Sequence, residues 1–353
     1  MPEEIDALIA QINRKQKEEL LVPGTSLRNT TWQRTTTGSL AFDAMLGGGW
    51  PLNCWNEIIG HESSGKSTMA MKTIAANQKA NPDYHTLWVA SEEFDPEWAE
   101  VLGINIDNIT FVMTNVMENA YDTVLAILAE RLVDAVVIDS YPALVPSEEE
   151  DKTMMQLTVG RGAYLTNKFM RKSLSATRRS LVQSDRPCLG LFINQWRERV
   201  GLIFGDPRTT PGGKGKNYTF MTRVDVAREE WIKKDSVKVG QIIKATTIKN
   251  KTAPPQRVAT VPYYFDDYGH HAKGSYDTLR QVYSIAVDRD ILEQRGAWYY
   301  FGKSKWQGEK QVLAALQADP LLLHAVENTT RHIMFGEPLE ISEAPRRRSI
   351  SRK

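Results

Sequence analysis

The segment Gly60-His-Glu-Ser-Ser-Gly65-Lys66-Ser67 has the residue types and spacing of a loop that binds the phosphates of a nucleotide. Its glycines let backbone N–H groups wrap around a phosphate with no Cβ in the way. A helix predicted over 68–78 points its positive end at the same phosphate. We expect Lys66 to reach the β- and γ-phosphates and the Ser67 hydroxyl to bind Mg²⁺. The predicted nucleotide contacts of this loop are Gly60, His61, Glu62, Ser63, Ser64, Gly65, Lys66, Ser67 and Thr68.

A phosphate loop requires an acidic partner for the metal at the end of another strand, and Asp139 fits that place. The apolar run 135–138 leads directly into Asp139, whose carboxylate can hold the hydration shell of Mg²⁺. A strand that ends in an exposed aspartate is common in isolation. Beside a phosphate loop, a metal role for Ser67 and Asp139 is the better interpretation.

Two adjacent glutamates, Glu92 and Glu93, follow the apolar run 87–90. Hydrolysis of a nucleotide needs a carboxylate that orients and deprotonates the attacking water. We take Glu92 as this base, with Glu93 as the alternative. Either glutamate could instead be a solvated residue at the start of a helix, where the helix dipole favours an acid.

Short apolar runs separated by helix-like segments indicate the elements that position these residues. Buried strands alternating with helices are typical of a parallel, doubly wound sheet. Polar residues follow the C-terminal end of each run, which is where open α/β sheets bind their ligands. The predicted strands are 57–60, 87–90, 136–139 and 191–194.

The flanking segments have other patterns. Residues 3–20 carry apolar side chains at helical spacing, so we expect an amphipathic helix that packs either on its own domain or on a neighbouring subunit. Alternating strands are predicted over 223–262. Residues 274–320 look mainly helical, with an aromatic patch at 298–301, and we interpret them as a small α/β appendage.

The charged residues nearly balance, with 44 Lys and Arg against 43 Asp and Glu, a formal net charge of +1. Any basic surface for nucleic acid must therefore come from local clustering. Two widely separated cysteines, Cys54 and Cys188, favour a reducing compartment and argue against structural zinc. No signal peptide is evident, and no run reaches the roughly 20 apolar residues of a membrane span. We expect a soluble, cytoplasmic protein with no membrane partner.

Further segments carry a more specific pattern. Thr37-Gly-Ser-Leu-Ala-Phe-Asp43 precedes the phosphate loop, and a longer block runs from Phe192-Ile-Asn-Gln195 to Gly212-Gly213. Arg295-Gly-Ala-Trp-Tyr lies in the appendage. Together these segments resemble the bacterial RecA recombinase family over about residues 35–335, as a divergent member of it.

The resemblance implies a fold and an activity. The fold is an α/β RecA-type P-loop ATPase core with a mainly parallel twisted sheet. The implied divisions are the core over 35–270 and a small α/β C-terminal domain over 271–335. The residues themselves predict an N-terminal helix and linker over 1–34 and a basic, disordered tail over 336–353. The implied activity is ATP- and Mg²⁺-dependent strand exchange. The protein would form a helical homo-oligomeric filament on single-stranded DNA and pair it with duplex DNA.

The resemblance also implies roles around the nucleotide. Gln195 would sense the γ-phosphate and act in catalysis together with Glu92 and Lys66. Asp95 and Trp98 would contact the adenine.

Other implied roles lie at the subunit interface and on DNA. Lys249 and Lys251 would reach the ATP of a neighbouring subunit. The basic residues of the segment 196–220, which follows Gln195, can neutralise DNA phosphates, although without the resemblance a solvated loop is the plainer interpretation. The implied DNA contacts are Arg171, Arg197, Arg199, Val200, Arg208, Gly212, Gly213, Lys214 and Lys216.

Departures from the family leave alternatives open. The segment between Glu92 and Asp95 is one residue shorter than in the family, so an alignment without a gap would place Ser91 at the catalytic position. The region of the first DNA loop, near 148–162, is strongly acidic at its start. A ring-shaped helicase of the same superfamily and a non-catalytic ATP-binding regulator therefore remain alternative functions.

Overall fold

The computed structural model describes residues 3–16, 21, 32–150, 160–183, 186–198, 207–213 and 215–337. Its contacts divide the chain into two units, residues 1–33 and residues 34–353. Most of the predicted first DNA loop and the predicted tail beyond residue 337 lie outside the described residues. So do three predicted DNA contacts, Arg199, Val200 and Lys214.

The first unit contains α1 (Glu3–Gln16), which covers the described part of the helix predicted over 3–20. Asn13 ties this helix to the chain that follows it. Its Nδ2 donates to the Leu21 carbonyl oxygen at 2.7 Å, and the Leu21 N–H donates to its Oδ1 at 2.8 Å. The partner of the apolar stripe on α1 stays a prediction.

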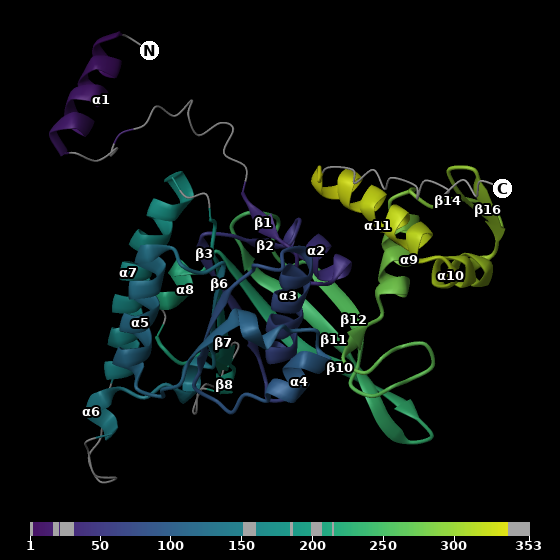
Figure 1. The fold of residues 1–353 in the computed structure, drawn as a ribbon, viewed down its shortest axis with the longest axis horizontal. Coiled ribbons are helices and arrows are strands. Elements are labelled where there is room, and N and C mark those ends of the chain that lie inside the picture. The colour runs from purple at the N-terminus through teal and green to yellow at the C-terminus, as the bar shows by residue number, and fades with distance from the viewer. Residues whose placement is uncertain are drawn as a thin grey trace, which may run out of the picture. The chain divides into compact units, whose positions relative to one another are not determined.

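The second unit is built around a nine-stranded sheet with the order β13-β12-β11-β10-β3-β7-β6-β4-β5 (Figure 1). The parallel strands are β3 (Cys54–Gly60), β7 (Leu189–Gln195), β6 (Ala135–Asp139), β4 (Thr86–Ala90) and β5 (Ile109–Val112). The antiparallel strands are β10 (Thr222–Lys234), β11 (Val237–Asn250), β12 (Val258–Tyr264) and β13 (Ser275–Tyr276). The two halves join where β10 pairs in parallel with β3, which places Arg223 opposite Glu57.

Helices cover both faces of the parallel half, and apolar side chains of the strands alternate between them. In β6, Ala135 and Val137 pack in one core while Val136 and Ile138 pack in the other. Burial on both faces explains why these strands appear in the sequence as unbroken apolar runs. The first core is covered by α2 (Leu40–Leu46), α3 (Lys66–Ala80) and α4 (Pro96–Val101), and the second by α5 (Met117–Glu130) and α7 (Arg161–Gln183).

The four strands predicted from apolar runs lie within β3, β4, β6 and β7, and the predicted helix 68–78 lies within α3. The predicted α/β core with a mainly parallel sheet is confirmed. Shorter elements complete this part of the chain. They are β1 (Arg34–Thr35), β2 (Trp50–Pro51), α6 (Ser147–Glu150), β8 (Arg197–Glu198), β9 (Arg208–Thr209), α8 (Gly215–Thr219) and the 3₁₀ turns Ile106–Asn108 and Tyr141–Ala143.

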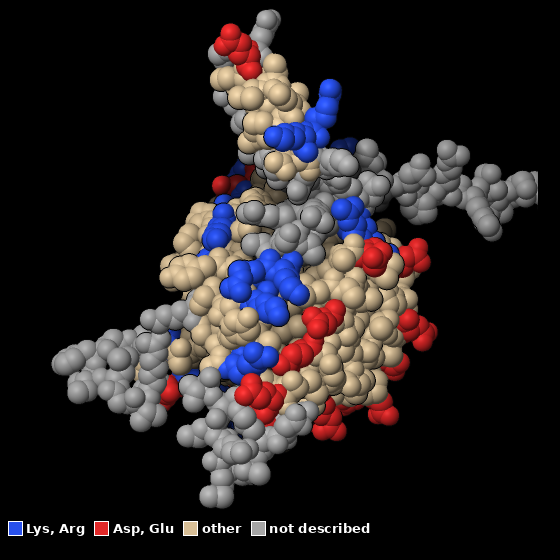
Figure 2. All heavy atoms as spheres, turned by 90° about the vertical axis from the view of Figure 1, so that its left-hand side faces the viewer, with Lys and Arg blue, Asp and Glu red and all other residues tan. Residues whose placement is uncertain are grey.

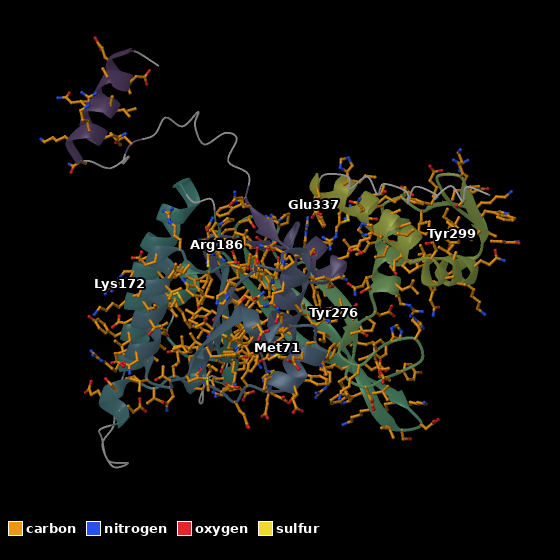
Figure 3. The ribbon with its side chains drawn as sticks, viewed as in Figure 1. Met71, Lys172, Arg186, Tyr276, Tyr299 and Glu337 are labelled. Atoms are coloured by element: carbon orange, nitrogen blue, oxygen red, sulfur yellow. The ribbon has the colours of Figure 1, made fainter. Side chains whose placement is uncertain are left out.

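The C-terminal segment packs around a third apolar core, which it shares with Leu40 of α2 and in which Val282, Leu292, Val312 and Val326 are fully buried. Tyr299 lies among the side chains of this segment (Figure 3). The region predicted to be mainly helical contains a three-stranded antiparallel sheet, and the aromatic patch is its central strand. The elements are α9 (Thr278–Asp288), β14 (Glu293–Arg295), β15 (Trp298–Phe301), β16 (Ser304–Gln307), α10 (Glu309–Ala318) and α11 (Pro320–Phe335). Within the described residues, no helix is long and apolar enough to cross a membrane.

Candidate nucleotide and DNA site

The phosphate loop joins β3 to α3, and its backbone is shaped to approach a ligand closely. A Cβ at Gly60 would lie 2.3 Å from the Val226 carbonyl oxygen, so only glycine fits there. Gly65 has a φ of +101°, in the left-handed region that glycine adopts without strain. The Ser64 hydroxyl is buried and has no hydrogen-bond partner within the described residues. A buried polar atom left unpaired is costly, so this loop fits a bound phosphate.

Lys66 is the first residue of α3, and its side chain folds back over the loop. Its Nζ donates to the His61 carbonyl oxygen at 2.7 Å. Desolvation by burial lowers the pKa of Lys66, while the nearby carboxylates of Asp139 and Glu92 act in the opposite direction. An ammonium held this way is available to a phosphate that enters the loop. The neighbouring His61, Glu62 and Ser63 are exposed, and Ser67 and Thr68 are half-buried.

Ser67 and Asp139 meet at the base of the loop, as the metal prediction requires. The Ser67 hydroxyl donates to Asp139 Oδ1 at 3.3 Å. Burial raises the pKa of Asp139 to about 7, because this carboxylate has little compensating charge. Mg²⁺ takes one or two protein oxygens and keeps several waters, so a hydroxyl and a carboxylate form a suitable donor pair. Among the described residues, no group of three or more His, Cys, Asp and Glu side chains offers a rival metal site.

Glu92 lies beside this pair, directly after β4. The Ser140 hydroxyl donates to Glu92 Oε1, and Gln195 Nε2 lies 3.5 Å from the same oxygen. Ser91 instead donates its hydroxyl to the Ser140 carbonyl oxygen at 2.8 Å. Glu93 is exposed. Within this segment, Glu92 is therefore the carboxylate that the structure brings together with the predicted sensor.

Gln195 ends β7 directly opposite Gly60 at the end of β3. Its backbone N–H donates to the side chain of the preceding residue, Asn194 Oδ1, at 2.9 Å. The pairing of β3 with β7 thus holds the first residue of the phosphate loop next to the predicted γ-phosphate sensor.

The two residues predicted to contact adenine lie at the start of α4. Asp95 caps this helix, because its Oδ1 accepts a hydrogen bond from the Trp98 N–H at 3.0 Å. Trp98 is half-buried, and Lys273 Nζ lies 5.2 Å from the centroid of its ring. Lys72 of α3 links the end of α4 to the residue after Lys273, because its Nζ donates to the carbonyl oxygens of Leu102 and Gly274 at 3.2 and 3.1 Å.

Lys249 and Lys251, predicted to reach a neighbouring subunit, lie at the end of β11 and just after it. Lys249 Nζ donates to the carbonyl oxygens of Asn217 and Tyr218 at 2.6 and 3.2 Å, and Lys251 Nζ donates to that of Tyr218 at 3.2 Å. Burial lowers the pKa of Lys249 to about 8, with further lowering from Lys251 and Arg223.

The predicted DNA segment is held at its base by a two-stranded ribbon, β8 with β9, which pairs Arg197 with Thr209. Arg208 lies over the Trp196 ring, and its Nη1 is 3.2 Å from Asp225 Oδ2. The indole N–H of Trp196 donates to the same carboxylate at 2.7 Å.

Two other groups of predicted DNA contacts are also described. Gly212 and Gly213 both have positive φ, 91° and 73°. Arg171 is exposed on α7 together with Lys168 and Lys172. Figure 2 looks onto the side of the molecule that carries α5 and α7, and it shows Lys and Arg side chains gathered there beside acidic ones.

Lys216, predicted to contact DNA, lies instead in the interior. Its side chain is 0% exposed, and its Nζ is 3.2 Å from Glu57 Oε1. It also donates to the Thr210 hydroxyl at 2.7 Å. The prediction was wrong because the five-residue helix α8 turns Lys216 inward, where its ammonium cannot reach a DNA phosphate.

Sequence reasoning missed Ser140 and Glu57, which contact predicted site residues or their neighbours. Ser140 follows the predicted metal ligand, but a serine after a strand carries no distinctive signal. Glu57 is different, since it lies within the buried strand β3 and is itself 0% exposed. An acid inside an apolar run requires a buried cation as its partner. That requirement predicts a buried cation beside Glu57, and the structure identifies Lys216 and Arg223 as the cations.

Comparison with known proteins places these residues in a family. The sequence matches the model of the RecA N-terminal domain over residues 3–269. Protein RecA of Staphylococcus aureus strain JH9 is 35% identical over 317 residues, which cover 88% of this chain and 87% of that protein. The same figures hold for Protein RecA of Staphylococcus aureus strains Newman and Mu50.

Proposed function

Because this chain belongs to the RecA family of recombinases, we propose that its phosphate loop, Glu92 and Gln195 form the ATPase centre that drives DNA strand exchange. The protein is a DNA-dependent ATPase that acts in homologous recombination. One observation carries the assignment of the centre. Glu92 accepts from Ser140 next to Asp139, and the same carboxylate oxygen lies within reach of the Gln195 amide.

Each residue of this centre has a distinct part in the proposal. Ser67 and Asp139 hold Mg²⁺, which supplies charge neutralisation for the phosphates. Lys66 binds the β- and γ-phosphates from the loop. Glu92 orients the attacking water and takes its proton, and the Ser140 hydroxyl orients Glu92.

Gln195 supplies the link to DNA in this proposal. An amide at the end of β7 can donate to the γ-phosphate of ATP and has no such partner in ADP. The ribbon β8–β9 continues directly from Gln195, so movement of this amide is transmitted to the segment that it precedes. Asp95 and Trp98 hold the adenine.

The proposed partners are single-stranded DNA, duplex DNA and further copies of the chain in a helical filament. Lys249 and Lys251 reach the ATP of the adjacent subunit, and the cytoplasm is the proposed compartment. Lys216 has no direct DNA contact in this proposal. The proposed DNA contacts are Arg171, Arg197, Arg208, Gly212 and Gly213, together with Arg199, Val200 and Lys214 outside the described residues.

ATP hydrolysis measured with and without single-stranded DNA tests the proposal. We expect DNA to stimulate the rate, and Glu92→Gln to lower kcat by about 10²- to 10⁴-fold because it removes the general base. Glu93→Gln is the matched control and should keep the wild-type rate. Equal losses in both variants would overturn the assignment of the base. Absence of any rate in the wild type would instead favour the non-catalytic regulator.

A further inference from the structure

Glu57 is the centre of a buried charge cluster that lies beside the ATPase centre. Its Oε1 accepts hydrogen bonds from Asn194 Nδ2 at 2.8 Å and from Lys216 Nζ at 3.2 Å. Its Oε2 accepts from Arg223 Nε at 2.5 Å. The side chains of Glu57 and Lys216 are both 0% exposed, so their charges are compensated by each other and by Arg223.

The cluster continues toward the predicted sensor through Asn194. The Asn194 side chain donates to Glu57 with its Nδ2 and accepts from the Gln195 N–H with its Oδ1. Both ends of this amide are therefore used. Asn194 thus links the Glu57 carboxylate to the backbone of Gln195.

The cluster also continues toward the DNA segment through Lys216. Its Nζ donates to the Thr210 hydroxyl at 2.7 Å and to Asn217 Oδ1 at 3.0 Å. Gly212 packs so closely on the lysine stem that a Cβ there would lie 2.8 Å from Lys216 Cε. Lys216 thus holds the residues that follow β9 on both sides of Gly212.

We infer that Glu57 and Lys216 are positioning residues that couple the Gln195 sensor to the DNA-contacting segment around Thr210 and Gly212. The contacts form one continuous chain, Gln195–Asn194–Glu57–Lys216–Thr210. A buried charge that loses its partner carries a large desolvation cost, so we expect these contacts to be kept when Gln195 or Thr210 moves. The inference rests on the proposed function and specifies how ATP and DNA communicate in it.

Linkage makes this coupling measurable. If bound ATP tightens DNA binding by a given factor, bound DNA tightens ATP binding by the same factor. The readout is the ratio of two dissociation constants for a fluorescent single-stranded oligodeoxythymidylate, without nucleotide and with a non-hydrolysable ATP analogue. A residue that only stabilises the fold changes the melting temperature, but it does not change this ratio in the folded protein.

Lys216→Met is the primary variant. Methionine matches the unbranched lysine stem, and Glu57 keeps Arg223 and Asn194 as partners, so no carboxylate is left unpaired. We expect the ratio to fall on the order of tenfold, within the usual range of coupling between sites. Lys79→Met, in the exposed last turn of α3, is the matched control and should keep the wild-type ratio.

Thr210→Val cuts the same chain at another bond and leaves the pair of Glu57 and Lys216 in place. We expect its ratio to fall in the same direction as that of Lys216→Met. If Lys216→Met does not fold, the ratio measured for Thr210→Val tests the coupling role by itself.

The possible outcomes distinguish the proposed function from the coupling role of Glu57 and Lys216. A wild-type protein whose DNA affinity does not depend on nucleotide would contradict the proposed function. A wild type with this dependence, and folded Lys216→Met or Thr210→Val that retains it, would overturn the coupling role alone.

Discussion

The buried charged residues of this protein differ in how completely their charges are compensated. A charge with several partners stabilises the fold, whereas a charge with few partners is suited to bind a ligand. Asp43 is fully buried and accepts from the Thr36 hydroxyl, the Thr37 N–H and Arg331. Asp139 is also buried but is held mainly by one serine hydroxyl, and its pKa rises to about 7. A group with so little compensation gains most from a bound cation, which is consistent with a metal ligand.

Lys249 gives a prediction about pH. Burial lowers its pKa to about 8, so above that pH the free protomer carries it increasingly as the neutral amine. Contact with a phosphate of the adjacent subunit requires the ammonium, so filament assembly must then take up a proton. We expect the assembly constant to fall above pH 8, approaching about tenfold per pH unit, and to be insensitive to this group below pH 7.

Sedimentation over a pH range of about 1.5 units on either side of the pKa of Lys249 measures this dependence. Lys249→Arg stays charged throughout and should lack the alkaline fall. A fall of the same size in Lys249→Arg would show that another group is responsible.

At the scale of elements, one buried ion pair ties the C-terminal segment to the ATPase core. Arg331 of α11 donates to Asp43 of α2 at 3.0 Å and to Glu327 at 3.1 Å. Gln281 of α9 adds a second tie, because its Oε1 accepts from the Ser39 hydroxyl and lies 3.3 Å from the Ala41 N–H. The segment from α9 to α11 is therefore anchored on α2.

Removing the arginine of this pair should be strongly destabilising. Arg331→Met leaves Asp43 buried without its cation, and we expect the free energy of unfolding to fall by about 3–5 kcal/mol. The exposed pair of Arg295 and Glu293 provides the control, since Arg295→Met should cost no more than about 1 kcal/mol. Urea denaturation of both variants measures the difference, and equal effects would contradict the anchoring role.

The sequence predicted elements where a single physical requirement dominates. The parallel strands are buried on both faces, so β6 is visible as an unbroken apolar run. The strands β14 and β16 are short and largely polar, and they were missed within a segment that looked helical. The residues around Lys216 in the sequence do not predict that it is buried, because its burial depends on Glu57, which lies far away in the chain.

The residues of the candidate site also fall into those with local requirements and those with distant partners. Backbone requirements of the phosphate loop are local, so Gly60 and Lys66 could be assigned from spacing. The choice among Ser91, Glu92 and Glu93 depends on Ser140 and Gln195, which reach this segment only through the sheet. Residues whose partners lie on other strands therefore needed the structure.

At the scale of the whole molecule, function in the proposed filament depends on contacts between copies. The net charge of +1 gives no general attraction to DNA, so the proposed DNA binding requires local groups, and the exposed basic residues of α7 are candidates. The contacts divide the chain into residues 1–33 and the unit that contains the ATPase core. The amphipathic stripe of α1 still needs a partner, and another copy of the chain is one candidate.

Deletion of residues 1–33 tests the partner of α1. If α1 docks on a neighbouring subunit, the shortened protein should keep its melting temperature within a few degrees and lose most of its assembly on single-stranded DNA. Differential scanning fluorimetry and sedimentation measure the two properties. A lower melting temperature with undiminished assembly would show that α1 packs on its own subunit.

The position of β3 in the sheet has a consequence for synthesis of the chain. Its neighbours are β7 (Leu189–Gln195) and β10 (Thr222–Lys234), both of which are translated long after β3 itself. A nascent chain therefore carries the phosphate-loop strand with both edges unpaired until β7 has emerged from the ribosome, and with one edge unpaired until β10 has emerged. Exposed apolar strand edges promote aggregation, so the ribosome-bound intermediate is the form of this protein most in need of a chaperone.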